Sequence, residues 1–320
     1  MSDTLWLWIG FNVFVLGMLA LDLGVFHRHA HVVKFKEAAT WSVVWILLAC
    51  VFGAGLYQLH PNGPQASLEF FTGYLIEKSL SIDNIFIFVL IFSAFAVPAA
   101  YQHRVLFWGI LGALVMRGFF IGVGAWMLEQ FHWIIYIFGA FLIVTGIKMG
   151  LERERVMEIE GNAVVKLTRR IFPVTSEYRK DRFFVREAGK LMATPLFVVL
   201  VMVEFTDLIF AVDSIPAIFA VTRDPFLVYS SNVFAIMGLR SLYFLLAGVV
   251  DRFHLLKIGL AIVLVFVGIK MLLVETAWKV PTLWSLVVIG GVIGASIALS
   301  LIFPKAAKEE MEPEHPVIEG

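Results

Sequence analysis

The sequence predicts an all-α polytopic membrane protein of about nine transmembrane helices that contains an inverted three-helix repeat. Composition is the first reason: 60% of the 320 residues are hydrophobic, 16% are charged and the mean hydropathy is +0.88, as in membrane rather than soluble proteins. The second reason is a series of apolar runs long enough to span a membrane. The third is a set of sequence anchors that occurs twice.

Each apolar run has about the 20 residues that an α-helix needs to cross the hydrocarbon core. Tryptophans lie near several run ends, as in the aromatic belt of a membrane interface. The first run has no basic segment before it and is too long for a signal peptide, so we expect it to be a retained span. The predicted spans are 5–25, 41–59, 68–92, 104–127, 133–150, 193–219, 228–249, 255–274 and 283–303.

Basic residues predict the orientation of these spans. Lys and Arg are concentrated in one set of loops, and the opposite set holds few beyond Arg223 and Lys279. Because cytoplasmic loops carry the excess of positive charge, we expect an inner (plasma) membrane protein with its N-terminus outside and its C-terminus in the cytoplasm. The basic positions assigned to the cytoplasm are Arg28, Lys34, Lys36, Arg104, the 152–190 stretch, Arg252, Lys257, Lys305 and Lys308.

The chain divides into five parts. The central loop mixes charges of both signs and is predicted to be a solvated connector, within which residues 162–172 have the pattern of a short amphipathic helix on the membrane surface. The tail after Pro304 is acidic and interrupted by prolines, as disordered segments are. The parts are 1–67 with two spans, 68–151 as repeat 1, 152–192 as the charged cytoplasmic loop, 193–276 as repeat 2, and 277–320 with the last span and the tail.

Matching anchors at similar spacings predict the internal repeat. Arg117 and Arg240 lie in corresponding spans, and residues 81–86 align with 205–210. Each copy holds three spans, so the second copy enters the membrane from the opposite side. This is the arrangement of many secondary transporters, whose binding sites lie between the repeats. The clearest anchors are Phe131-His132 followed by Gly146-Ile147-Lys148-Met149, and Phe253-His254 followed at the same interval by Gly268-Ile269-Lys270-Met271.

Carboxylates lie inside two of the predicted spans. Each costs roughly 2.5–3.5 kcal/mol on insertion scales, so chains keep them only where partners, water or a bound cation compensate the charge. On a regular helix Glu77, Ser81 and Asn84 share one face, whereas Asp83 projects away from it. The candidate metal site comprises Glu77, Asp83, Asn84, Glu204, Asp207 and Asp213, with Ser81, Ser214, Arg117 and Arg240 as candidate supporting residues.

These acids converge only if a helix is broken. Glu204 and Asp207 share a face, but Asp213 points nearly opposite to Glu204 on a regular helix. Pro216 cannot donate to the carbonyl of Val212, so it predicts a break beside Asp213, and the first repeat has no matching proline. The available ligand atoms are all oxygen, which suits Mg²⁺, Ca²⁺ and Mn²⁺ rather than Zn²⁺ or Cu⁺.

The same residues also have structural explanations. Glu77 can pair with Lys78 or Lys148, and Asp83 or Asp207 with Arg117 or Arg240, which would make the acids members of buried ion pairs. For Asp22, in the first span, both a structural ion pair and a place in the functional site stay possible. The other expected structural roles are those of Lys148 and Lys270, which end helices and snorkel, and of His27, His29 and His31, in a basic interfacial loop.

Three motifs carry a resemblance to a known family. They are Glu77-Lys78-Ser79-Leu80 with Asp83-Asn84, then Phe210-Ala211-Val212-Asp213-Ser214-Ile215-Pro216, and a run with Asp224-Pro225-Phe226, Ser231-Asn232 and Gly238-Leu239-Arg240. Over roughly residues 68–275 the chain resembles the TerC family of integral membrane proteins, in particular its Alx-type branch. That family is named for tellurium resistance, its members look like manganese exporters, and related cation exporters share the inverted repeat. The resemblance implies that Glu77, Asp83, Asn84, Glu204, Asp207 and Asp213 line a cation path.

The sequence therefore predicts a secondary transporter that exports divalent cations, Mn²⁺ foremost, by alternating access. No nucleotide-binding or hydrolase motif is present, so we expect neither enzyme activity nor a cofactor. Cys50 is the single cysteine, and the 25 basic and 25 acidic residues balance, so neither a disulfide framework nor nucleic-acid binding is indicated. Two rivals stay open: an oxyanion transporter of the tellurite type using Arg117 and Arg240, and a membrane scaffold acting through the 152–190 loop.

Overall fold

The computed structural model describes most of the chain. The described residues are 2–21, 35–151, 162–187, 189–247, 253, 255–276 and 278–303, without the side chains of 2–4, 21 and 83. Several predictions concern positions outside this part: Asp22, the histidine cluster at 27–31, Lys34, Arg252, His254, Lys305, Lys308 and the acidic tail.

Helices make up most of the described structure, and their bounds follow the predicted spans closely. They are α1 Ser2–Leu21, α2 Phe35–Leu59, α3 Gly63–Ala94, α4 Ala99–Gln130, α5 Ile134–Leu151, α6 Ala163–Ile171, α7 Pro195–Phe219, α8 Pro225–Met237, α9 Leu239–Leu246, α10 Leu256–Leu272 and α11 Thr282–Ile302. Two strands, β1 Phe184–Glu187 and β2 Lys190–Ala193, form a hairpin between α6 and α7.

Five of the described helices, α2, α4, α5, α7 and α11, are long and apolar enough to cross a membrane. The 32-residue α3 is also long enough to cross a membrane, but it differs from these five in carrying Glu69, Glu77 and Lys78 along its length. The span predicted at 228–249 is built as two shorter helices, α8 and α9, which meet at Gly238. The structure thus confirms a mostly helical membrane protein, and the total of about nine spans stays a prediction.

The hairpin is a departure from the predicted all-α fold. Its strands have four residues each, which is too short to produce a recognisable alternating pattern in the sequence. Gly189, at the turn, has a φ of +77°, a left-handed conformation that glycine adopts at little cost. The amphipathic helix predicted at 162–172 is present as α6, and the Asn162 side chain caps it by accepting a hydrogen bond from the Val164 backbone N–H.

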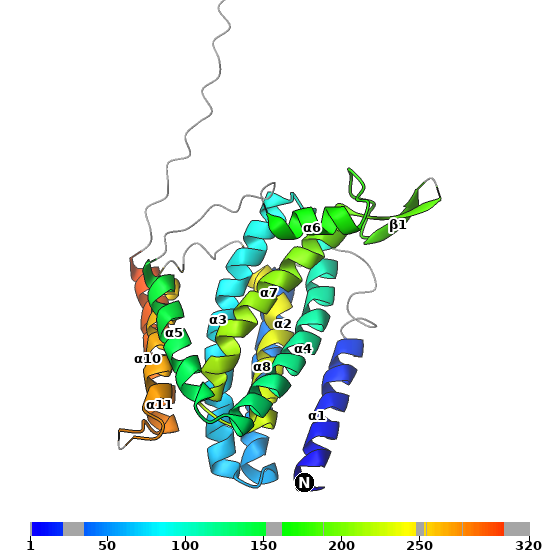
Figure 1. The fold of residues 1–320 in the computed structure, drawn as a ribbon. Helices are drawn as coiled ribbons and strands as arrows, with labels where there is room; N and C mark the ends of the chain where they lie inside the picture. The colour runs from blue at the N-terminus through cyan, green and yellow to red at the C-terminus, as the bar shows by residue number, and fades with distance from the viewer. Residues whose placement is uncertain are drawn as a thin grey trace, which may run out of the picture.

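The helices form two groups that run roughly side by side (Figure 1). The larger, which we call the main bundle, contains α2, α3, α4, α7 and α8, with α1 along its edge. The smaller, which we call the three-helix group, contains α5, α10 and α11. α6 lies across the end of α7 at the upper end of the molecule, and the hairpin projects beyond it (Figure 1). One hydrophobic core cluster includes residues of both groups, among them Ile76 of α3, Ile215 of α7 and Leu264 of α10.

Glycines allow α5 and α10 to approach each other closely. A Cβ atom on Gly139 would lie 3.0 Å from the backbone oxygen of Gly268, and one on Gly268 would lie 2.6 Å from the backbone oxygen of Gly139. On the same helix pair, a Cβ on Gly146 would lie 2.8 Å from the oxygen of Ala261. Small residues at such positions let helix backbones pack tightly inside a membrane.

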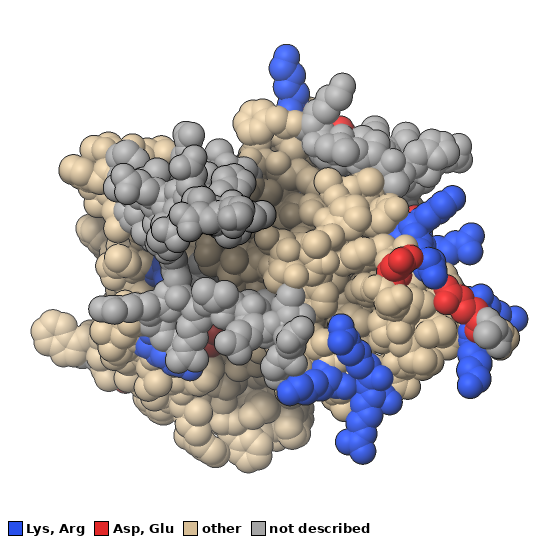
Figure 2. Space-filling model, turned by 90° about the horizontal axis from the view of Figure 1, so that it is seen from above, with Lys and Arg blue, Asp and Glu red and all other residues tan. Residues whose placement is uncertain are grey.

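The end of the molecule that carries α6 and the hairpin is rich in basic side chains. Figure 2 looks onto this end and shows Lys and Arg projecting around one side of it. All of the basic residues of α6 and the hairpin region are exposed: Lys166, Arg169, Arg170, Arg179, Lys180, Arg182, Arg186 and Lys190. This is the end that the positive-inside rule predicts to face the cytoplasm.

Candidate functional site

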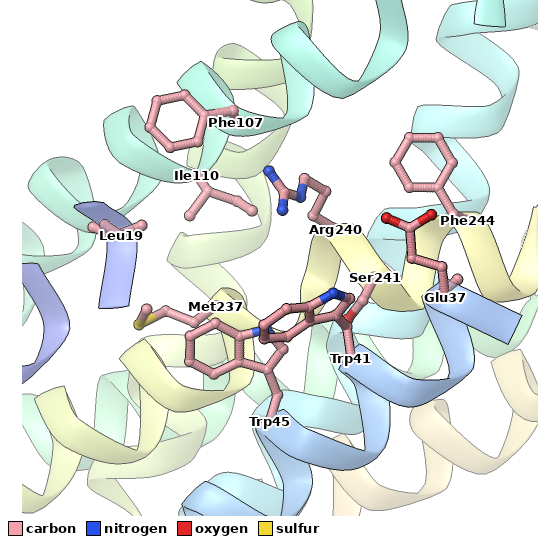
Figure 3. Close-up of a pocket in the computed structure, with 11 residues that line it drawn as sticks. Leu19, Glu37, Trp41, Trp45, Phe107, Ile110, Met237, Arg240, Ser241 and Phe244 are labelled. Atoms are coloured by element: carbon pink, nitrogen blue, oxygen red, sulfur yellow. The ribbon is translucent and has the colours of Figure 1, made fainter. Parts of the chain in front are cut away.

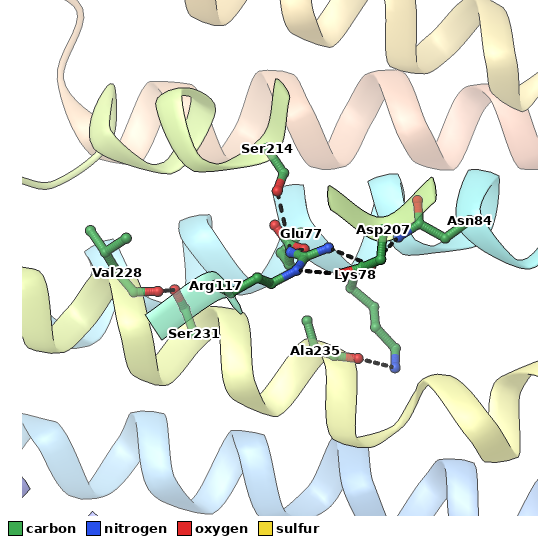
Figure 4. A network of polar contacts seen from close by, with 9 residues as sticks. All are labelled: Glu77, Lys78, Asn84, Arg117, Asp207, Ser214, Val228, Ser231 and Ala235. Carbon is green, nitrogen blue, oxygen red and sulfur yellow. Dashed lines mark hydrogen bonds and ion pairs between the residues drawn. The ribbon is translucent and has the colours of Figure 1, made fainter. Parts of the chain in front are cut away.

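A buried polar network joins the helices of the main bundle. At its centre is Arg117 of α4, which contacts Glu77 of α3 and both Asp207 and Ser214 of α7 (Figure 4). The three charged residues are at most 3% exposed. The network therefore places two carboxylates and one guanidinium deep between three helices.

Arg117 donates hydrogen bonds in two directions. Its Nε and Nη2 lie 3.2 and 3.0 Å from the two carboxylate oxygens of Asp207, a bidentate geometry that favours strong pairing. Its Nη1 donates to Oε1 of Glu77, and the Ser214 hydroxyl lies 3.3 Å from the same nitrogen. With two acids on one base, the formal charge of this trio is −1.

Helical spacing explains how these side chains meet. Glu77 and Asn84 lie seven residues apart on α3, and Asp207 and Ser214 lie seven apart on α7, so each pair projects from one face of its helix. The Nδ2 atom of Asn84 completes the network at 3.4 Å from Oδ1 of Asp207. Because the two faces oppose each other, α3 and α7 both contribute to the centre that Arg117 enters from α4.

Several buried polar atoms around this network have no hydrogen-bond partner within the described part of the chain. Leaving such an atom unpaired costs about 1–3 kcal/mol, so each marks a place where a ligand, an ion or water would be stabilised. The unpaired oxygens of the candidate site are Oε2 of Glu77, Oγ of Ser81, Oδ1 of Asn84 and Oε2 of Glu204. All four come from α3 and α7, the two helices that carry the predicted acids.

Glu204 lies one turn before Asp207 on α7 and packs against α4. A Cβ atom on Gly112 would lie 2.0 Å from Oε1 of Glu204, so the carboxylate occupies the space that a side chain at position 112 would fill. Gly112 therefore leaves the space that the Glu204 carboxylate occupies. No sequence motif indicated this role of Gly112.

Asp213 does not join the network, and the predicted break in α7 is wrong. The helix runs continuously from Pro195 to Phe219 with Pro216 inside it. Its last six residues are all buried, and this packing holds the final turn in place despite the lost hydrogen bond. Asp213 consequently faces α5, where it interacts with Thr145 and lies near Lys148.

The remaining predicted residues have separate places. Asp83 belongs to α3, but its side chain is outside the described part of the structure. Arg240 is apart from Arg117: it lines a small pocket with Glu37, Trp41 and Ser241 (Figure 3). Of the pairings left open from the sequence, that of Asp207 with Arg117 is confirmed, whereas Glu77 pairs with Arg117 instead of Lys78 or Lys148.

Two polar residues, Lys78 of α3 and Asn232 of α8, occur in the sequence motifs quoted above but were not assigned to the candidate site. The ammonium of Lys78 lies 3.4 Å from the carbonyl oxygen of Ala235, close to the junction of α8 and α9 at Gly238. Asn232 of α8 is fully buried, and neither of its amide atoms has a hydrogen-bond partner within the described residues. The signal for Asn232 was present, since a polar amide inside an apolar run costs free energy in a membrane unless it finds a partner.

The observed conformation has no preformed metal centre in the part of the chain described. No three His, Cys, Asp or Glu side chains there converge closely enough to hold an ion. Arg117 instead lies between Glu77 and Asp207, where it supplies the positive charge that both carboxylates need. A divalent cation that bound both oxygens of Asp207 would therefore have to displace the guanidinium.

Comparison with known proteins places this arrangement in a family. A model described as the integral membrane protein TerC family matches residues 62–308, which include every element of the polar network. The chain belongs to the TerC family. No solved structure matches the chain.

Relatives within the TerC family match along nearly their whole length. A membrane protein of Myxococcus xanthus described as uncharacterized is 58% identical over 296 residues, covering 92% of each chain. A protein of Escherichia coli (strain K12), named only as a candidate membrane-bound redox modulator, Alx, is 52% identical over 295 residues, 90% of this chain and 91% of its own. A Rickettsia felis membrane protein is 40% identical over 300 residues, 92% and 99% of the two chains.

Proposed function

We propose that this TerC-family chain is a secondary transporter that exports divalent cations, Mn²⁺ foremost, from the cytoplasm. The observation that carries the proposal is the row of unpaired carboxylate, amide and hydroxyl oxygens along α3 and α7, beside a trio of formal charge −1. Oxygen ligands of this kind suit hard divalent ions such as Mn²⁺. Intramembrane acids without full compensation are typical of ion pathways.

In this proposal Arg117 acts as the internal counterion of the empty transporter. An incoming cation would bind Asp207, Glu77 and neighbouring oxygens while Arg117 moves away, and release would let the guanidinium return. This exchange keeps a positive charge beside the buried carboxylates at each stage, which matters because an uncompensated buried charge costs several kcal/mol. Displacement of Arg117 would also break the ion pairs that join α4 to α3 and α7, so these helices could rearrange when the ion binds.

Contacts between α5 and α10 support the inverted repeat that alternating access would use. Gly139 contacts Gly268, and Gly146 contacts Ala261. The residue pairs 139/261 and 146/268 are each separated by the 122 residues that separate Phe131 from Phe253. If positions 122 residues apart are equivalent, the contact of 139 with 268 becomes the contact of 261 with 146, and both contacts are present. A two-fold axis relating the two copies is expected to give such a pair of contacts. We infer that α3–α5 and α7–α10 are the two copies, within about nine spans that begin outside and end in the cytoplasm.

A cavity of about 590 Å³ supports a route from one face. It opens beside the start of α3, the end of α7 and the end of α10, on the side away from α6. Its lining includes the buried residues Phe219 and Met271, which belong to the same apolar cluster as Ile76 and Ile215, the chain neighbours of Glu77 and Ser214. This apolar layer would serve as the closed gate between the cavity and the acids.

The name of the Escherichia coli relative raises a redox role as the alternative. Cys50 is the one cysteine among the 320 residues, so an intrachain dithiol exchange has no second thiol here. The oxyanion alternative has also lost support, because the Arg117 guanidinium is engaged by Glu77 and Asp207. Cation transport therefore has the stronger structural support.

The test is uptake and release of radioactive Mn²⁺ by proteoliposomes that contain the purified protein, with and without a pH gradient. We expect flux in the wild type and its loss in Asp207→Asn and Asp83→Asn. Glu129→Gln, the same chemical change at an exposed position at the end of α4, is the matched control and should retain flux. Normal flux in Asp207→Asn, or none in well-folded wild type, would overturn the proposal.

A further inference from the structure

The cavity on the side away from α6 holds an unusual buried cation. Lys270, in the last turn of α10, is 8% exposed, and its Nζ has no hydrogen-bond partner within the described residues. The snorkelling predicted for Lys270 from the sequence therefore does not occur. A buried ammonium without a partner is costly, so this group would be stabilised by an anion in the cavity.

The two carboxylates that line the same cavity are already engaged by neutral donors. Oε1 of Glu69 accepts a hydrogen bond from Nε2 of Gln65 at 2.8 Å, and Oε2 of Glu275 accepts one from the Tyr136 hydroxyl at 2.9 Å. No ion pair joins either acid to Lys270 in the part of the chain described. The charge of Glu69 acts on Lys270 through space, but neither acid is a hydrogen-bonded or ion-paired partner of its ammonium.

Two further basic residues face this space. Arg223 and Lys279 line the cavity with Lys270, and neither forms an ion pair among the described residues. With three basic and two acidic side chains, the lining carries a formal charge of +1. Its electrostatics therefore favour an anionic rather than a cationic occupant.

A helix terminus adds a second kind of anion-binding group. α11 begins at Thr282, both Pro281 and Thr282 line the cavity, and the N-cap Pro281 provides no side-chain hydrogen bond to the helix. The first backbone N–H groups of a helix lack intrahelical partners and carry the positive end of its dipole. Phosphate and related oxyanions bind at such termini in many proteins.

We propose that this cavity binds a phosphate-type oxyanion between Lys270 and the N-terminus of α11. Its volume of about 590 Å³ is ample for inorganic phosphate or for the headgroup of a phospholipid. The anion neutralises Lys270 and links α10 to α11. This is the same cavity proposed above as a route to the acids, but the anion site uses none of the acids of the polar network, so phosphate binding does not depend on cation transport.

Binding of radioactive inorganic phosphate to the full-length protein tests the proposal, by equilibrium dialysis in detergent at a fixed chloride concentration. We expect saturable binding in the wild type and at least about tenfold weaker binding in Lys270→Met, as loss of a charge-assisted contact predicts. Lys257→Met removes the same charge from the other end of α10 and should leave binding nearly unchanged. Lys270→Arg keeps the charge and should keep binding, which separates loss of the site from loss of the fold.

The source of the phosphate group is decided by repeating the measurement in lipid nanodiscs. If a lipid headgroup occupies the site, free phosphate binds in discs of neutral lipid and is excluded in discs of anionic phospholipid. If inorganic phosphate is the occupant, both kinds of disc give the same affinity when the measurement is made at high salt, which screens the surface charge of the anionic lipid. The proposal is overturned if wild type shows no saturable binding in detergent and neutral discs, or if Lys270→Met and Lys257→Met bind alike.

Discussion

Arg117 of α4 holds Asp207 of α7 through both carboxylate oxygens, at 3.2 and 3.0 Å, while it also donates to Glu77 of α3. One guanidinium thus ties three membrane helices together at a point buried from solvent and lipid. Together with Glu77 the pair links three helices of the bundle, and in the proposed transport any cation that binds Asp207 would have to compete with Arg117.

Replacing Arg117 by Met should destabilise the protein strongly. Two buried carboxylates would lose their common counterion, and breaking such a pair costs about 3–5 kcal/mol. Thermal unfolding in detergent measures the effect. Combining Arg117→Met with Glu77→Gln and Asp207→Asn removes the uncompensated charges, so the triple variant should recover much of the stability. Equal stability of Arg117→Met and wild type would show that Glu77 and Asp207 are not both ionised in the folded protein.

Gly112→Ala should impair cation flux with little effect on stability. The new Cβ would lie 2.0 Å from Oε1 of Glu204, a flexible side-chain end that can move away, so the expected stability change is below about 1 kcal/mol. Gly122→Ala on the same helix meets nothing within 4 Å and is the matched control. Proteoliposome flux and thermal unfolding of both variants make the comparison. Unchanged flux in Gly112→Ala would remove Glu204 from the proposed path.

Gly268→Ala should weaken the contact between α5 and α10. Its Cβ would lie 2.6 Å from a backbone oxygen of Gly139, which cannot move without shifting the helix, so we expect a loss of about 1–3 kcal/mol. Gly139→Ala faces the reciprocal contact at 3.0 Å and should have a smaller effect of the same sign. Gly291→Ala, which has open space on the neighbouring α11, should be neutral or stabilising. Thermal unfolding of the three variants tests the order.

The charged loop should loosen at acid pH through Asp181. Partial burial alone would raise the pKa of Asp181, but the hydrogen bond at 2.5 Å and the charge of Arg104 hold that pKa below its usual value. A lowered folded-state pKa gives stability above the unfolded value of about 3.9, and this stability is lost as the pH falls through the folded value.

Because both side chains are about a third exposed, the contribution of this pair is expected to stay below about 1 kcal/mol. Limited proteolysis of the loop, compared between wild type and Asp181→Asn, measures it. The two proteins should differ near neutral pH and become alike as the pH falls through the lowered pKa of Asp181. Glu177→Gln, which alters a more exposed ion pair with Arg179, is the control. A difference that persists at low pH would contradict the assignment.

The sequence by itself determined the membrane class, the helix order and the acids. Long apolar runs fold as helices wherever lipid leaves backbone groups no other partner, so α2, α4, α5, α7 and α11 lie where hydropathy predicts them. Helical periodicity likewise placed Glu77, Ser81 and Asn84 on one face of α3. These are local properties, in which each residue depends on its chain neighbours.

Only the tertiary structure decided which side chains meet. Periodicity could not show that Arg117 would reach Glu77 and Asp207, because that contact depends on how α4 packs against α3 and α7. Nor could it show that α7 would continue through Pro216 and turn Asp213 toward α5, since the packing of the last turn outweighs a local breaker. The space beside Gly112 and the isolation of Lys270 arise in the same way, from distances between helices that are far apart in the chain.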